Sequence, residues 1–381
     1  MQRTRLSFAL AALALLLSTP GMAQGQKNMV EIAKLPAVQL HAEWQAREVR
    51  ASPAIKQNLA TLRSRIQSEK LTFQVGYTEA MDKSLAQLTG LKVPANVAQL
   101  ATQVNARAVN FMKIDEAARI RYKIPPIVLS CSASQPAWDM RKQGKVTPIR
   151  NQATCGSCWD FAACAAWEVS NLIRNGTSAD LSEQQILTCS GGGDCTGGWY
   201  MPVFDWMINH GVCNESACPY THADNPGSKA AWTALPSPNH AIAWGFVRPD
   251  AGIPSVADMK KAICAHGSVA VAFRATAGFQ SYVGGIFNEH DPGPINHAVL
   301  LIGWDDAKQA WLMKNSWGTW WGDTCGYGTE RGYCWIAYNS NSIGNHAAWV
   351  DAKRTAYIIP RDIIEKIDVH ILRSSVIPKH Q

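Results

Sequence analysis

The chain has 381 residues, with 36 Lys and Arg against 29 Asp and Glu and a formal net charge of +7. This length leaves room for two or three compact units. The basic residues are scattered along the sequence and form no stripe, so we interpret the charge as a source of solubility and expect no nucleic-acid partner.

The first 23 residues predict a secretory signal peptide. Arg3 and Arg5 precede the apolar run LSFALAALALLL, and small residues follow at Gly21 and Ala23. This order is typical of a signal cut after Ala23, whereas about twelve apolar residues are too few for a transmembrane helix. We therefore expect a secreted or periplasmic protein without a stable membrane anchor.

Residues 24–130 predict a helical region. Apolar residues recur close to helical spacing in 54–71 and again in 97–122, and the stretch LTGLKVP lies between the two patterns. A linker follows at 124–136, where two prolines and small polar residues favour an extended chain. Downstream, Trp, Gly and Cys become abundant, which predicts a mixed α/β region.

Eleven cysteines lie between Cys131 and Cys334. In an exported protein most of them should pair, and an odd number leaves at least one free thiol. The count agrees with a thiol enzyme but does not require one.

The stretch NQATCGSCWDF at 151–161 places Cys155 and Cys158 in a C-x-x-C spacing. Three alternatives fit this spacing: a redox dithiol, half of a metal site, or a nucleophilic thiol beside a structural one. A zinc site would need a second ligand pair, and CSGGGDC at 189–195 has the wrong spacing for it, so we expect no metal and no cofactor. A nucleophilic cysteine needs a histidine, a group that orients the histidine, and donors for an oxyanion.

Two downstream stretches supply such partners. GPINHAVLLIGWD at 293–305 places His297 before an apolar run, where a strand would hold its ring. AWLMKNSWGTWWG at 310–322 places Asn315 after another apolar run, with Trp317 two residues later. A cysteine at a helix start, a histidine on one strand and an asparagine on the next are the components of a thiolate–imidazolium pair, which the positive end of the helix dipole stabilises.

Five blocks in this order resemble the papain-like cysteine peptidases: PIRNQATCGSCWDF, LSEQQILTC, CTGGW, INHAVLLIGW and KNSWGTWWG. The resemblance extends from about Trp138 to Ala352. It implies an α+β fold with a helical lobe and a β-barrel-like lobe, preceded by a helical propeptide. The expected parts are a signal peptide at 1–23, a propeptide at 24–130, a catalytic domain at 131–352 and a C-terminal extension at 353–381.

The resemblance also implies roles for individual residues. Cys158 would be the nucleophile and His297 its general base and acid. Asn315 would orient the His297 ring, and Trp317 would shield their hydrogen bond from water. Gln152 would donate its side-chain amide to the oxyanion, alongside the backbone N–H of Cys158.

For the cysteines, the resemblance implies a bridge from Cys155 to Cys195. Cys325 and Cys334, in what looks like an insertion at 323–334, are expected to close a hairpin. Cys189 is expected to pair with either Cys213 or Cys218, and the alternatives stay open.

The expected substrate cleft contains bare backbone at Gly197 and Gly198, which an extended peptide can pair with like an added strand. The pocket for the side chain one residue before the scissile residue should favour apolar or aromatic groups. The expected substrate-binding residues are Gly197, Gly198, Trp199, Tyr200, Ala272, Asn296 and Trp317.

One departure from the family is Asp160, where a small residue is usual. Its charge would oppose ionisation of the thiol at close range. Two residues along a helix correspond to a rotation of about 200°, so we expect Asp160 to face away from the Cys158 sulfur.

We therefore expect a secreted cysteine endopeptidase made as a zymogen, a monomer that acts on polypeptides and is inhibited by its own propeptide. Endopeptidase activity is favoured over exopeptidase activity because no His–His insert that would cap the cleft is present. The alternatives are a catalytically silent papain-like binding protein, which should have lost a catalytic group, and a redox protein, which would leave Gln152, His297 and Asn315 without a role. For the C-terminal extension an extra strand or helix, a removable segment and a contact with the propeptide all remain open.

Overall fold

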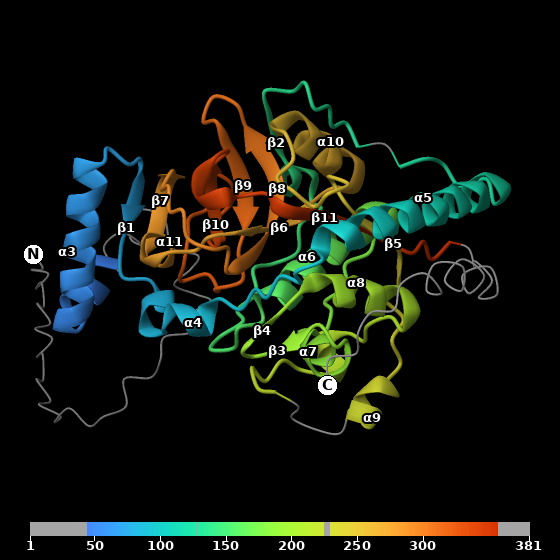
Figure 1. Cartoon of the computed structure of the whole chain (residues 1–381), viewed down its shortest axis with the longest axis horizontal. Coiled ribbons are helices and arrows are strands. Elements are labelled where there is room, and N and C mark those ends of the chain that lie inside the picture. Colours follow the sequence, from blue (N-terminus) through green and yellow to red (C-terminus); the bar gives the residue numbers. More distant parts are fainter. Residues whose placement is uncertain (1–43, 128, 225–228, 357–381) are drawn as a thin grey trace, which may run out of the picture.

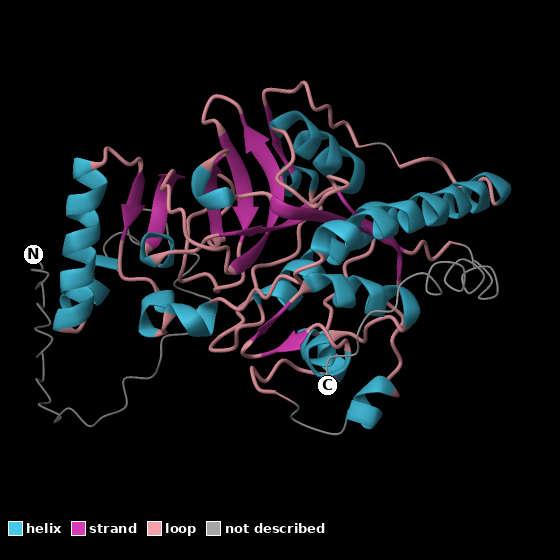
Figure 2. Ribbon diagram, viewed as in Figure 1, coloured by secondary structure: helices cyan, strands magenta, loops and turns pink. Residues whose placement is uncertain are grey.

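The computed structural model describes residues 44–127, 129–224 and 229–356. The predicted signal peptide, the beginning of the predicted propeptide and most of the C-terminal extension lie outside these residues. In Figure 1 the strands of the main sheet gather in one half of the molecule, and helices α7 to α9 lie in the other half together with the short strands β3 and β4; Figure 2 shows the same arrangement by colour.

Residues 44–127, which we call the N-terminal segment, lie against both halves. Ser52 begins the first long helix, because its hydroxyl accepts a hydrogen bond from the Ile55 N–H at 3.3 Å and proline follows at the first helical position. The helices and strand of this segment are α3 (Pro53–Ser68), β1 (Phe73–Val75), the 3₁₀ turn η1 (Glu79–Asp82), α4 (Leu85–Leu88) and α5 (Val97–Arg121).

The rest of the chain, which we call the main domain, contains the remaining elements. Its helices are η2 (Met140–Gln143), α6 (Cys158–Arg174), α7 (Glu183–Cys189), α8 (Tyr200–Asn209), η3 (Glu215–Ala217), α9 (Lys229–Thr233), α10 (Val256–His266), α11 (Ala277–Gln280) and η4 (Ser340–Ser342). Its strands are β2 (Ala137–Asp139), β3 (Gly193–Asp194), β4 (Gly197–Gly198), β5 (Ala241–Phe246), β6 (Val269–Phe273), β7 (Tyr282–Phe287), β8 (His297–Asp305), β9 (Ala310–Lys314), β10 (Tyr333–Ala337) and β11 (Asn345–Ala352).

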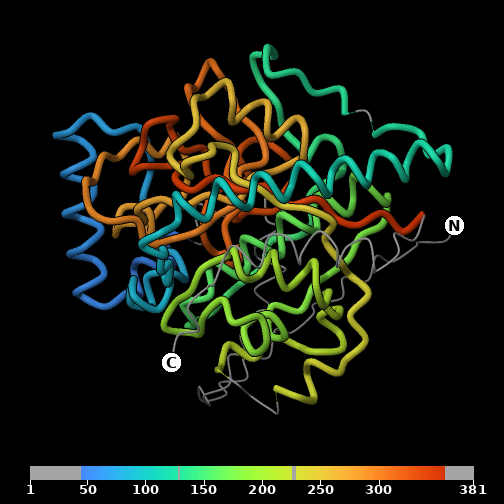
Figure 3. The backbone as a smooth tube through the Cα atoms, turned by 45° about the vertical axis from the view of Figure 1, so that its right-hand side comes forward, coloured from blue at the N-terminus to red at the C-terminus, as the bar shows by residue number. Residues whose placement is uncertain are grey.

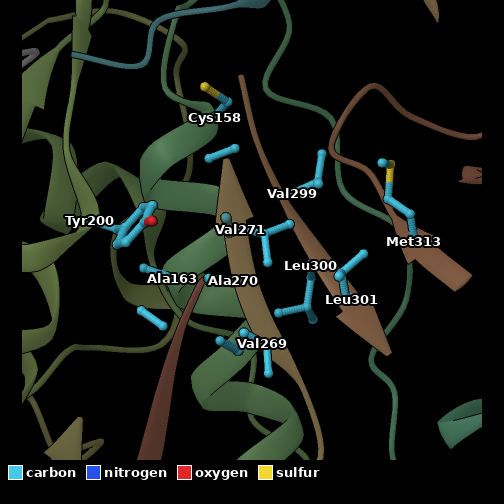
Figure 4. Packing of buried hydrophobic residues seen from close by; sticks show 14 of the residues in the cluster. Cys158, Ala163, Tyr200, Val269, Ala270, Val271, Val299, Leu300, Leu301 and Met313 are labelled. Atoms are coloured by element: carbon cyan, nitrogen blue, oxygen red, sulfur yellow. The ribbon is translucent and has the colours of Figure 1, made fainter. Parts of the chain in front are cut away.

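The main sheet has the strand order β1-β7-β10-β9-β8-β6-β11-β5, and β2 pairs with β8 outside this path. Residues 297–304 of β8 are all buried, as expected of a central strand covered on both faces. Helix α6 packs against β8 and β11. Figure 4 shows Cys158 at the N-terminal end of this helix, beside the strands that carry Val271 and Val299. The interface between helix and sheet is therefore the core that positions the end of α6.

Helix α5 docks on the main domain through one buried stripe. Ala101, Val104, Ala108 and Phe111 are buried, and their spacing of three and four residues is that of one helix face. The helix packs against β5, and Figure 3 shows it crossing the front of the molecule, with α3 at one side.

Strand β1 extends the sheet of the main domain. It pairs antiparallel with β7, with Phe73 opposite Gly285. Gly285 has a φ of +80°, and a Cβ atom there would lie 2.4 Å from the Thr72 carbonyl oxygen. Glycine therefore permits both the local backbone conformation and the close approach of β1. The N-terminal segment is thus integrated into the fold at the sheet as well as through α5.

The expected helical patterns are confirmed: 54–71 corresponds to α3 and 97–122 to α5. The mixed region that follows is an α+β fold, as predicted. Over the part of the chain that the structure describes, no helix combines the length and the apolar character needed to cross a bilayer.

Two disulfides are present, and one of them is the expected bridge between Cys155 and Cys195. The other joins Cys131 to Cys264 and thereby ties the start of the linker to α10. The expected hairpin bridge is wrong, because Cys325 and Cys334 are both buried free thiols. Cys189 is also a free thiol, as are both of its expected partners, Cys213 and Cys218.

Candidate active site

Cys158 is the first residue of α6, so its sulfur lies at the positive end of that helix. Backbone N–H groups of Ala298, Gly90 and Trp159 hydrogen-bond to the sulfur and favour the thiolate. The side chain is nevertheless fully buried, and burial raises the pKa of the Cys158 thiol to about 11. The thiol is therefore neutral in this form of the protein.

His297 is the first residue of β8, and the N–H of its neighbour Ala298 points at the Cys158 sulfur. Its Nε2 donates to Asn315 Oδ1 at 2.9 Å, because an amide oxygen can only accept. Its Nδ1 has no hydrogen-bond partner among the described residues. The Nδ1 of His297 thus keeps a free lone pair, and the next residue, Ala298, contacts the Cys158 sulfur.

Burial also controls the charge of the histidine. It lowers the pKa of His297 to about 4, and the hydrogen bond with Asn315 opposes this only in part. The Trp317 ring lies 4.7 Å from the His297 ring, centre to centre, at 33°. The Trp317 ring therefore packs directly against the imidazole that bonds to Asn315.

Gln152 is held so that its amide N–H₂ group points into the site. Its Oε1 accepts from the Ser316 hydroxyl at 2.7 Å, and its Nε2 donates to the Cys155 carbonyl at 2.9 Å and to the Leu88 carbonyl at 3.1 Å. The indole Nε1 of Trp317 donates to the same Leu88 oxygen at 3.2 Å. Two donors of the main domain therefore converge on one carbonyl of the N-terminal segment.

Residues 88–92, which we call the blocking segment, begin at the last residue of α4 and cross the site as an extended chain from residue 89. The Gly198 N–H donates to the Gly90 carbonyl at 2.7 Å, and the Lys92 N–H donates to the Gly198 carbonyl at 2.8 Å. Leu91 and Gly198 form a parallel bridge. The backbone at Gly198 thus pairs with an extended part of the protein's own chain.

Two glycines make this close approach possible. A Cβ atom on Gly90 would lie 1.9 Å from the Gly156 carbonyl oxygen, and one on Gly197 would lie 2.4 Å from the Gly90 carbonyl oxygen. Gly197 also has a φ of +129°, which favours glycine. The blocking segment can reach the sulfur only because both positions lack side chains.

The residues expected to line the side-chain pocket have different surroundings in the structure. The Trp199 and Tyr200 rings stack at 4.1 Å, and the Tyr200 hydroxyl donates to the His346 carbonyl. Ala272 is buried within β6. The Asn296 side chain, expected to complete the pocket, is instead bonded to the Ala275 backbone at 2.8 and 3.0 Å.

It is the Asn296 carbonyl that contacts the N-terminal segment. It accepts hydrogen bonds from the N–H groups of Gly90 and Leu91, at 3.1 and 3.0 Å. The side chain therefore shapes the turn, and the main chain presents the acceptor.

Asp160 is fully buried on α6 and accepts a hydrogen bond from the Cys164 thiol at 3.4 Å. Burial and the nearby Glu183 raise its pKa well above the usual value. The site thus disfavours the charge on Asp160, and the groups that shift the pKa of Cys158 do not include it.

Sequence reasoning missed two contributors, Ser316, which orients Gln152, and the blocking segment. Ser316 lies inside a recognised block but shows its role only through its distance to Gln152. Gly90 and Pro94 interrupt the helical pattern of the sequence. The sequence alone did not indicate that this interruption contacts the Cys158 thiol.

Taken chemically, the site holds a thiol, an imidazole with a free nitrogen, an amide that orients the imidazole, and donors directed at a carbonyl oxygen. This set suits nucleophilic attack on a carbonyl carbon followed by stabilisation of an oxyanion. Cys155 is bonded to Cys195, so the C-x-x-C motif is neither a redox dithiol nor half of a zinc site.

Comparisons with known proteins agree with this chemistry. A family model described as papain family cysteine protease matches residues 134–350. Cysteine proteinase 2 of Entamoeba histolytica is 35% identical over 227 residues, covering 54% of this chain and 64% of that protein. Ananain of Ananas comosus is 30% identical over 262 residues, covering 68% of this chain and 66% of ananain. The chain thus spans slightly less than two thirds of the length of these two relatives.

Solved structures of precursors match both parts of the chain. Recombinant stem bromelain precursor superposes with a TM-score of 0.58 at 25% identity, covering 84% of this chain and all of that one (100%). Digestive procathepsin L 3 of Tenebrio molitor superposes with a TM-score of 0.57 at 22% identity, covering 83% and 100%. The superposed part of this chain is in both cases larger than the part that follows residue 130. The similarity in fold therefore includes the N-terminal segment.

The raised pKa of Cys158 leads to a measurable pH profile. In the full chain, we expect iodoacetamide to label Cys158 slowly, with a rate that keeps rising up to about pH 10, because only the thiolate reacts. Mass spectrometry of the labelled peptide gives the rate, and Cys158→Ser gives the background. A rate that levels off near neutral pH would show that the thiolate is already formed and that burial does not control it.

Proposed function

Because the chain belongs to the papain family of cysteine proteases, we propose that it hydrolyses peptide bonds with Cys158 as nucleophile, and that the described form is its zymogen. One observation carries the proposal. The donors of Gln152 and Trp317, directed at a carbonyl oxygen beside the thiol, are occupied by the Leu88 carbonyl.

In the proposed mechanism, His297 Nδ1 takes the Cys158 proton and the thiolate attacks the carbonyl carbon of the scissile bond. The oxyanion accepts hydrogen bonds from Gln152 Nε2 and the Cys158 N–H. The imidazolium then protonates the leaving amine, and a thioester remains. His297 next deprotonates a water molecule that attacks the thioester, and the proton returns to the Cys158 sulfur as the acid product leaves.

Asn315 serves this cycle through its bond to His297 Nε2, which leaves Nδ1 available to exchange the proton in every step. An amide suits this role because it orients the ring without adding a charge. Gln152 suits the role of oxyanion donor better than a cation for the same reason, since a positive charge there would compete with the imidazolium for the thiolate.

Removal of the blocking segment should form the ion pair. Exposure to water lowers the pKa of the Cys158 thiol and raises that of His297, because burial is the largest cause of both shifts. The N–H groups at the start of α6 then favour the thiolate. Activation is thus a change of solvation at groups that are already in place.

The proposed substrate is an extended polypeptide. The blocking segment supports this, since it passes through the site in extended form and pairs with Gly198. A chain that continues in both directions fits an endopeptidase. The uncharged stack of Trp199 and Tyr200 supports a preference for an apolar or aromatic side chain one residue before the scissile residue.

Charge supports the inhibitory role of the N-terminal segment. Its cations face carboxylates of the main domain in three ion pairs: Arg65–Glu289, Arg107–Asp205 and Lys92–Asp194. Protonation of such carboxylates in acid would weaken the docking, so we propose that the precursor matures on acidification. Export is proposed from the N-terminal signal pattern, and the two disulfides suit an oxidising compartment.

The nucleophile is tested by Cys158→Ser. We expect this variant to fold and to retain the N-terminal segment, but to lose peptide hydrolysis by at least about a thousandfold, because a serine hydroxyl ionises far less readily than a thiol. Turnover of a fluorogenic peptide after removal of the segment by an added protease gives the comparison. Residual activity within about tenfold of the parent would assign catalysis to another residue.

Inhibition by the blocking segment is tested by Gly90→Val. The added side chain cannot fit against the Gly156 carbonyl, so the uncleaved precursor should hydrolyse peptide at neutral pH while the parent precursor does not. Ala95→Val, at an exposed position in the same loop, is the matched control and should stay inactive. An inactive Gly90→Val precursor that still processes in acid would place inhibition elsewhere.

The Cys131–Cys264 bridge restricts where maturation can cut. A cut between Cys131 and Trp138 would leave the N-terminal segment attached through the disulfide. We therefore expect the mature chain to begin between Ile124 and Cys131. N-terminal sequencing and gels run with and without reductant test this, with Cys264→Ser as control. A segment that separates from the parent only after reduction would contradict the expectation.

A further inference from the structure

A groove of about 850 Å³ lies between α5 and the edge of the main domain. Val109, Met112 and Ile120 contribute to one wall, and Phe246, His266 and Trp349 form the other. We call this hollow the α5 groove. It contains none of the candidate active-site residues, and it shares only Ala108 with the docking stripe of α5.

The walls of the α5 groove are mainly apolar and open to solvent. Val109 is 53% exposed and Ile120 62% exposed, although both are large aliphatic residues. The indole of Trp349 stacks on the His266 ring at 3.9 Å and reaches across Gly245 toward Asn105 of α5. A mainly apolar surface that is open to solvent is typical of a binding site.

The described chain ends beside this groove. After β11, Arg354 makes an ion pair with Asp115 of α5 at 3.6 Å, and the Thr355 N–H donates to Asn175 Oδ1 at 2.9 Å. Asp115 is one helical turn from Met112 of the groove. In Figure 1 the last described residues project below the C-terminal half of α5. The described chain therefore ends next to the helix that forms one wall of the groove.

The sequence that follows suits such a site. Residues 357–381 contain Ile363, Ile367 and Ile371 at intervals of four, with Ile364 and Leu372 next to them. The groove residues of α5 recur at intervals of three and four from Val109 to Ile120, a length of about 17 Å at 1.5 Å per residue. The apolar residues of both sets therefore recur with a similar spacing in the sequence.

We propose that residues 357–381 lie in the α5 groove, with their aliphatic side chains between α5 and the wall of Phe246 and Trp349. Since one wall belongs to the N-terminal segment and the other to the main domain, the tail clamps the two together. Removal of the N-terminal segment destroys the groove and releases the tail. The regulatory consequence rests on the proposed zymogen, whereas the docking does not.

The test uses the full-length Cys158→Ser chain, which cannot process itself, and a second form truncated after Ala356. Hydrogen exchange of the α5 amides is the readout. Truncation should speed exchange at residues 109–121 by at least about tenfold, since the tail no longer holds the helix. The peptide 357–381 added to the truncated chain should restore slow exchange.

Matched substitutions identify the surface. The double variant Val109→Asp/Ile120→Asp places charges in the groove at exposed positions that tolerate polar residues, and it should exchange as fast as the truncated chain and not respond to the peptide. Asn110→Asp, exposed on the same helix outside the groove, should behave like the parent. Thermal unfolding of each variant checks that the main domain is intact.

Three results would overturn the proposal: unchanged exchange on truncation, equal response of the groove variant to the peptide, or protection that depends on protein concentration, which would indicate a second copy in the groove. Because none of these readouts involves peptide hydrolysis, a failure of the proposed activity would leave them unaffected. In the active chain, truncation should also speed acid maturation by about the same factor as exchange.

Discussion

In the proposed account, the hydrogen bonds from Gln152 and Trp317 to the Leu88 carbonyl determine the state of the whole site. They hold the blocking segment beside Cys158 and His297, and burial opposes the charged form of both side chains. In the proposed account the main domain needs no rearrangement to become active. It needs only the departure of a peptide that occupies the position of a substrate carbonyl.

Besides its own hydrogen bonds, the blocking segment is anchored on both sides by the rest of the N-terminal segment. Before it, β1 is paired with β7, and Arg65 reaches Glu289. After it, α5 buries a stripe that includes Phe111 against β5. Two anchors reduce the entropy cost of placing the short extended stretch between them. The proposed clamp by the C-terminal tail would strengthen the second anchor.

The sequence was most informative where chemistry requires particular residue types in a fixed order. Cys158 at a helix start, His297 at a strand start and Asn315 after the next strand all lie where the pattern predicted, and so does the bridge from Cys155 to Cys195. The failures concern contacts between segments far apart in sequence. Cys325 and Cys334 suggested a bridge by proximity in the chain, Asn296 turned its side chain away from the cleft, and Gly90 gave no sign of its position over the thiol.

The charge of His297 in the precursor tests the central claim most directly. The measurement uses the Cys158→Ser chain with the His297 imidazole selectively labelled for NMR. We expect a His297 pKa near 4, because the ring is buried. Adding Gly90→Val, which displaces the blocking segment, should return the pKa toward the ordinary value of about 6.5. An ordinary value with the segment in place, or a low value that Gly90→Val leaves unchanged, would contradict the claim that this segment controls the site.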